Sequence, residues 1–194
     1  MSETTPNGTE LPALKFKLTP EQAREKWFEA LESGQYRQGK GHLCNIVEIK
    51  EGASIETYCC LGVACEIFMK EEPEHALTVE INRNLKTYNG EASAPPWQVK
   101  QWLGLAQYGG RSLKLAPEAV PEHLRKSSAF ISRQRFFPDG SSEASIFELN
   151  DGLTTTHVDD TTCTFEQIAA ILRTNPPGLT APMPDPPMRN SIVQ

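Results

Sequence analysis

The spacing of apolar residues predicts three main helices, because side chains three and four positions apart share one face of a helix. The first has a strong start signal: Thr19 is a cap residue, Pro20 takes the first helical position and Gln22 completes a capping box. Trp27 lies on its apolar face, so we expect it to anchor the core. The expected bounds are Thr19 to Gly34, Cys59 to Lys70, and Thr164 to Leu172.

Between these helices, apolar and polar residues alternate in short runs, which is typical of half-buried strands. A turn at residues 51–54 joins the first two runs, and Asn89-Gly90 is a second turn signal. A shorter helix is expected after Pro95-Pro96, closed by Gly104, and a single helical turn at Glu122–Lys126. The expected strands are His42–Ile49, Ile55–Tyr58, Leu77–Ile81, Ala129–Phe137 and Ala144–Leu149. Hairpin-linked strands between helices predict an α+β fold with a small antiparallel sheet and about three helices.

The length of 194 residues suits one domain. We expect a flexible N-terminus over residues 1–13, a single domain over residues 14–174 and a disordered tail over residues 175–194. The tail prediction rests on its prolines, which exclude a regular helix or a central strand. These prolines are Pro176, Pro177, Pro182, Pro184, Pro186 and Pro187.

The net charge of −6 makes nucleic acid an improbable partner, because phosphate binding needs a basic surface. The chain shows no signal peptide and no apolar stretch of membrane-spanning length, so we expect no membrane partner and a cytoplasmic location. Five cysteines in such a chain are expected to be free thiols.

Several motifs follow one another in a familiar order. They are Trp27 to Gly41 (W-x-x-A-L-x-S-G-x-Y-x-Q-G-x-G), Tyr58-Cys59-Cys60-Leu61-Gly62-Val63, Trp102-Leu103-Gly104, Leu149-Asn150-Asp151-Gly152 and Phe165-x-x-Ile168-Ala169. This series resembles a widespread family of small phage, prophage and bacterial proteins without an established function. The resemblance covers roughly residues 22–173. It implies a phage or prophage setting and the host cytoplasm, and it implies no particular chemistry.

The junction at Tyr58-Cys59-Cys60 is the segment where chemistry is most plausible. A thiol at a helix N-terminus faces the positive end of the helix dipole, which favours the thiolate. Cysteine hydrolases combine such a thiolate with a histidine and an orienting carboxylate or amide, and His157 with Asp151 is available for these roles. The competing interpretation is that Cys59 and Cys60 pack in the core, as free cysteines commonly do. We favour core packing.

A small-ligand site is the second candidate at the same junction. Arg37 and Lys40, together with Tyr58 and Asn150, could converge with the helix start on an anionic ligand, for example a nucleotide-like one. His42 and Cys44 lie two residues apart near the cysteine pair, but their spacing fits no common zinc pattern. We therefore predict no metal and no cofactor.

Three classes of function remain open. The favoured one is a phage-type, non-catalytic accessory protein that binds a host protein or a small anionic ligand. The second is a cysteine-dependent hydrolase or transferase that uses Cys59 or Cys60. The third is a virion-associated structural component, in which the proline-rich tail would serve assembly.

Overall fold

The computed structural model describes residues 14–50, 52–106, 113–126, 141–152 and 162–180. The first helix, α1 (Pro20–Glu32), begins as the sequence predicts. Thr19 caps it, and the reciprocal hydrogen bonds between Thr19 and Gln22 form the capping box. The side chain of Trp27 is fully buried, so its prediction as a core anchor is confirmed.

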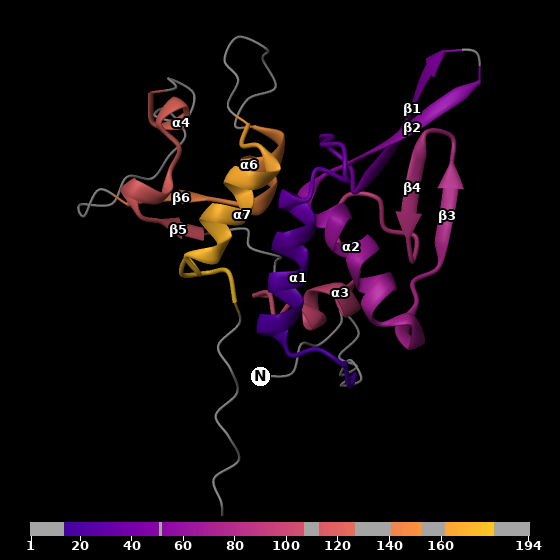
Figure 1. Ribbon diagram of the computed structural model, residues 1–194, viewed down its shortest axis with the longest axis horizontal. Coiled ribbons are helices and arrows are strands. Elements are labelled where there is room, and N and C mark those ends of the chain that lie inside the picture. Colours follow the sequence, from indigo (N-terminus) through magenta and orange to yellow (C-terminus); the bar gives the residue numbers. More distant parts are fainter. Residues whose placement is uncertain (1–13, 51, 107–112, 127–140, 153–161, 181–194) are drawn as a thin grey trace, which may run out of the picture.

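Four strands form one antiparallel sheet in the order β2-β1-β4-β3. Cys44 pairs with Tyr58 on one side and with Lys86 on the other, which fixes the register of β2, β1 and β4. The hairpin of β1 and β2 projects beyond the rest of the molecule, and α2 and α1 lie to one side of the sheet (Figure 1). The strands are β1 (Cys44–Lys50), β2 (Ala53–Tyr58), β3 (Val79–Asn82) and β4 (Leu85–Tyr88).

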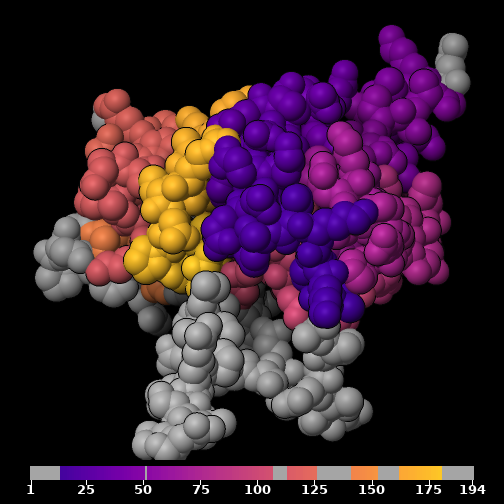
Figure 2. Space-filling view, turned by 60° about the horizontal axis from the view of Figure 1, so that its bottom comes forward, coloured from indigo at the N-terminus to yellow at the C-terminus, as the bar shows by residue number. Residues whose placement is uncertain are grey.

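Helix α2 (Cys60–Glu71) is the central element of the fold. Eight of its residues are buried, because α1 and α3 cover it on one side and the sheet covers it on the other. Helix α7 packs alongside α1, as the adjacent indigo and yellow surfaces in Figure 2 show. The other described α-helices are α3 (Trp97–Trp102), α4 (Glu122–Lys126), α6 (Ile146–Asp151) and α7 (Phe165–Arg173).

Both ends of α2 meet buried polar groups. At the C-terminal end, the carboxylate of Glu72 is only 1% exposed. It accepts hydrogen bonds from the backbone N–H groups of Lys17 and Leu18 and from the indole Nε1 of Trp102, at 2.9 to 3.2 Å. Because a buried carboxylate needs such donors, Glu72 ties the segment before α1 and helix α3 to the end of α2.

At the other end of α2, the backbone of the helix touches the backbone that leads into β1. A Cβ atom at Gly62 would lie 1.7 Å from the carbonyl oxygen of Leu43. The same carbonyl accepts a hydrogen bond from the N–H of Cys59 at 3.2 Å. Glycine at position 62 therefore permits a contact that any side chain would block.

The sequence and the structure differ most between β5 (Leu113–Leu115) and α6. The predicted strand Ala144–Leu149 is wrong: β6 (Ser142–Ala144) ends there, and Ser145 caps α6 through a capping box with Glu148. Strand β6 pairs with β5, which is not among the strands expected from the sequence. The predicted strand Ala129–Phe137 lies outside the described residues.

The described part of the C-terminal segment packs against the body. Leu179 is fully buried, and its carbonyl accepts a hydrogen bond from the N–H of Ala106 at 3.0 Å. Among the residues expected to form the tail, 175–180 are described, and this part packs against the body. Two short 3₁₀ helices complete the described elements, Pro73–His75 and Pro117–Ala119.

Replacing Gly62 with alanine tests the contact between α2 and Leu43. We expect Gly62→Ala to lower the free energy of unfolding by at least about 3 kcal/mol, because neither backbone segment can move away without breaking its hydrogen bonds. Chemical denaturation followed by circular dichroism measures this change. Lys70→Ala, at an exposed site on the same helix, is the control and should change it by less than about 0.5 kcal/mol. Equal effects of the two substitutions would contradict the contact.

Candidate functional site

The N-terminus of α2 brings together most of the residues that the sequence singles out. Cys59 is the N-cap, and its Sγ accepts a hydrogen bond from the N–H of Gly62 at 3.4 Å. A thiol thus occupies the position that Ser, Thr, Asp or Asn usually takes. The N–H of Cys60 donates to Oδ1 of Asn150 at 3.0 Å. Two of the first amides of the helix, those of Cys60 and Gly62, are therefore satisfied by side chains of the protein itself.

Asn150 connects three segments at this point. Its Nδ2 donates to the carbonyl of Gly39 at 2.9 Å and to Oδ1 of Asp151 at 2.6 Å. The Nε2 of Gln38 donates to the carbonyl of Cys163 at 2.8 Å, next to the same amide. Asn150 is 1% exposed, so these bonds form in the interior. The Gln-Gly, Cys-Cys and Asn-Asp motifs meet here in one buried hydrogen-bond network.

Burial works against thiolate formation in the cysteine pair. It raises the pKa of the Cys59 thiol to about 11, although hydrogen bonds from the backbone of Gly62 and Leu61 oppose this shift. Burial also raises the pKa of the Cys60 thiol well above its ordinary value, and the charges of Cys59 and Asp151 act in the same direction. The carbonyl of Cys60 accepts a hydrogen bond from Nε1 of Trp27 at 2.7 Å. The helix dipole is thus outweighed, and both thiols sit in the core as the favoured interpretation expects.

The remaining predicted residues divide into three groups. His157, the expected catalytic partner, lies outside the described residues. Arg37 and Lys40 are exposed; the carbonyl of Arg37 accepts a hydrogen bond from the N–H of Tyr58 at 2.8 Å, and that of Lys40 accepts one from Nδ2 of Asn45 at 3.1 Å. The side chains of Tyr58 and Asn150 are buried and hydrogen-bonded to other groups of the protein, Tyr58 to Glu56 and Asn150 to the start of α2. The catalytic and ligand-binding roles of these residues remain predictions.

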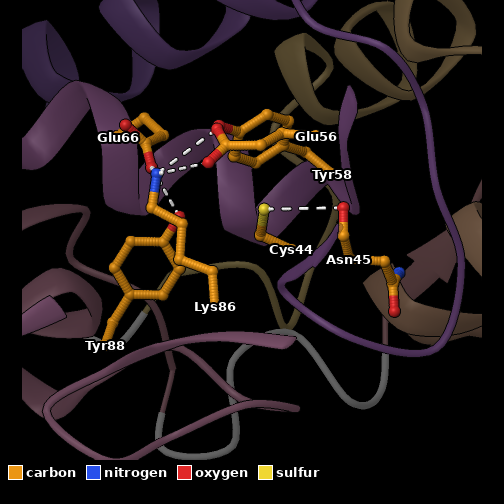
Figure 3. Close-up of polar contacts among 7 residues, drawn as sticks. All are labelled: Cys44, Asn45, Glu56, Tyr58, Glu66, Lys86 and Tyr88. Carbon is orange, nitrogen blue, oxygen red and sulfur yellow. Dashed lines mark hydrogen bonds and ion pairs between the residues drawn. The ribbon is translucent and has the colours of Figure 1, made fainter. Parts of the chain in front are cut away.

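Tyr58 belongs to a charged cluster on the face of the sheet that α2 covers (Figure 3). Lys86 is at its centre, with its Nζ 2.6 Å from Glu66 and 3.4 Å from Glu56. The hydroxyl of Tyr88 donates to Glu66 at 2.5 Å, and that of Tyr58 donates to Glu56. The ammonium also lies 5.7 and 5.8 Å from the centres of the two tyrosine rings.

The members of this cluster determine one another's charge states. Burial alone would lower the pKa of Lys86, but the hydrogen bond and charge of Glu66 and the charge of Glu56 raise it overall. Burial and the bonded carboxylates raise the pKa of both Tyr58 and Tyr88. The lysine therefore stays charged and the phenols neutral at physiological pH. The cluster holds β4 against α2. It was not expected from the sequence, because its members come from three separate elements.

The opposite face of the sheet, which we call the outer face, carries Asn45, Val47, Thr57, Leu85 and Thr87, since side chains alternate along each strand. Two adjoining hollows lie on it, of about 580 Å³ and about 650 Å³. Both are open to solvent and share Asn84 and Leu85. Lys40 and His42 line the first hollow, and Arg83 lines the second. The outer face therefore carries two adjoining open hollows that share two residues.

Neither a metal nor a membrane is indicated by the described residues. No three acidic, histidine or cysteine side chains among them are grouped closely enough to hold a metal ion. His42 instead makes a 3.3 Å contact with Ser93, and Cys44 is buried. Within the same residues, every helix is too short or too polar to cross a bilayer.

Comparison with known proteins places the chain in one family. A family model described as "Domain of unknown function (DUF8296)" matches residues 20–176, which is most of the chain. No curated protein and no solved structure matches the chain. The match confirms the expectation of a family without an established function, and it spans the α2 network and the sheet.

Removing the side chain of Asn150 tests the buried network. We expect Asn150→Ala to lower the free energy of unfolding by about 3 kcal/mol, because it leaves the N–H of Cys60 and the carbonyl of Gly39 without partners in the interior. Asn82→Ala is the matched control: Asn82 is exposed in β3, and its substitution should have an effect of less than about 0.5 kcal/mol. Urea denaturation of both variants gives the comparison, and a stable Asn150→Ala protein would contradict the structural role.

The raised thiol pKa values predict a loss of stability in alkali. A folded state that holds the thiol protons more tightly than the unfolded chain is stabilised below the unfolded pKa of about 9. That stabilisation should disappear as the pH rises from about 9 to about 11, the pKa of Cys59 in the fold. Thermal melting across this pH range measures the loss of stability. Alkylation followed by mass spectrometry measures the pH at which each thiol becomes reactive. Rapid alkylation of Cys59 or Cys60 below neutral pH would instead support cysteine chemistry.

Proposed function

This chain belongs to the DUF8296 family, and we propose that it is a non-catalytic binding protein whose partner is another protein. The resemblance to phage and bacterial proteins supports a setting in which a phage-encoded chain acts on a host protein in the cytoplasm. The proposal rests on one observation above all. Two open hollows lie side by side on an exposed sheet face, away from the buried cysteines.

The shape of the outer face favours a protein over a small ligand. The two hollows have the volumes of small-molecule sites, but such sites enclose most of the ligand surface. These hollows are open, and they extend across β1 and β4. Val47, which is 42% exposed, and the half-buried Leu85 offer apolar contact among amide and hydroxyl groups. A mixed, shallow surface of this kind is typical of interfaces between proteins.

The alternatives receive less support from the same observations. A hydrolase requires a thiol that ionises readily, whereas burial raises the pKa of Cys59 and Cys60. An anion bound at the start of α2 requires free amides, whereas Asn150 already accepts the hydrogen bond of Cys60. Binding through the outer face requires no change in the buried network.

Site-specific photo-crosslinking in bacterial cells tests this proposal. A photoreactive residue at position 47 or 85 should give a discrete protein adduct, whereas one at position 118 should not, because Glu118 is exposed on the distant Pro117–Ala119 segment. Adding Asn84→Arg, which alters both hollows, should abolish the adduct, and adding Cys59→Ser should not. The absence of adducts at positions 47 and 85, or their persistence in Asn84→Arg, would contradict the proposal.

A further inference from the structure

The edge of the four-stranded sheet at β3 exposes apolar side chains. Val79 is 40% exposed and Ile81 is 65% exposed, the highest value among the large apolar residues that the structure describes. Among the described residues, β3 pairs with β4 alone. An edge strand with exposed apolar side chains and no proline or lysine is a ready template for another strand.

The backbone of β3 offers hydrogen-bonding groups on this edge. The carbonyl of Thr78 accepts a hydrogen bond from the N–H of Asn89 in the neighbouring chain segment at 2.7 Å. In an antiparallel pair, successive residues point their N–H and C=O groups to opposite sides. The groups of Glu80 therefore face β4, and those of Val79 and Ile81 face outward.

We propose that β3 pairs with β3 of a second copy of this chain, antiparallel and about a two-fold axis at Ile81. The two Ile81 residues would exchange both of their hydrogen bonds, so that two four-stranded sheets become one continuous sheet. An isologous contact of this kind needs one self-complementary surface, and an edge strand with outward N–H and C=O groups provides it.

Charge and strand length select this register. With Ile81 opposite Ile81, Glu80 faces Asn82 of the second copy and Val79 faces Arg83 of the second copy, so no like charges are opposed. A register centred on Glu80 would place two carboxylates directly opposite each other. A register centred on Val79 would pair only Val79 with Val79 inside the strand, whereas the register centred on Ile81 pairs residues 80 to 82.

The proposed contact between the two β3 strands is small, and its size determines how tightly the dimer should form. A strand of four residues buries less surface than the roughly 1,200 Å² of a stable interface. Dimerisation should therefore be weak and depend on protein concentration. It uses the edge of the sheet, not the outer face, so it can succeed or fail independently of the proposed partner-binding function.

Sedimentation equilibrium over a wide concentration range tests the inference. The average mass should rise from that of the monomer towards that of the dimer, and Ile81→Lys should remove this rise because it places two ammonium groups opposite each other. Val47→Lys is the matched control: Val47 is a similarly exposed apolar residue on an inner strand of the same sheet, and the variant should still dimerise. A monomer at every concentration, or equal behaviour of the two variants, would overturn the proposal.

Crosslinking gives a second test that is specific for the register. The five native cysteines are buried, so a cysteine placed at an exposed site is the reactive one. Ile81→Cys should form a covalent dimer with a short bismaleimide, since paired strand residues lie about 5.5 Å apart. Val47→Cys should not. Circular dichroism melts confirm that both variants fold. Equal dimer yields from Ile81→Cys and Val47→Cys would also overturn the proposal.

Discussion

A helix that begins inside a protein leaves its first amide groups without partners within the helix, and α2 begins at such a place. Asn150 and Cys59 supply the missing acceptors, at 3.0 and 3.4 Å. Because Asn150 comes from α6 and also binds Gly39, the start of α2 can form only when three distant segments meet. The central helix and the chain around it thus depend on one buried network.

This constraint gives a physical meaning to the motifs that are most distinctive in the sequence. Gly62 lets the helix touch the carbonyl of Leu43, and Asn150 caps the helix. The aromatic residues have similar roles, since Trp27 donates to the carbonyl of Cys60 and Trp102 donates to Glu72. Unusual residue patterns can therefore arise from the needs of the fold, and the binding surface can lie elsewhere. Here we propose that it lies on the outer face of the sheet.

The sequence predicted the fold well where the residues that determine an element lie within that element or next to it. The capping boxes at Thr19 and Thr164 defined two helices, and the α+β class with an antiparallel sheet is confirmed. The strand predicted at Ala144–Leu149 failed because a short apolar run fits a strand or a helix equally, and the Ser145–Glu148 capping box decided for the helix. The Lys86 cluster and the hollows could not be predicted, since each depends on strand register and on residues far apart in the chain.

Our central claim is that the N-terminus of α2 is a closed part of the core and not a ligand or catalytic site. The most direct test is amide hydrogen exchange measured by NMR on the native protein. We expect the N–H of Cys60 to exchange among the slowest in the chain, at the rate of global unfolding, because its bond to Asn150 lies in the interior. The outward N–H of Ile81 on the sheet edge provides the fast reference at low protein concentration. Exchange of Cys60 as fast as that of Ile81 would mean that the start of α2 opens to solvent, as a ligand or catalytic site would require.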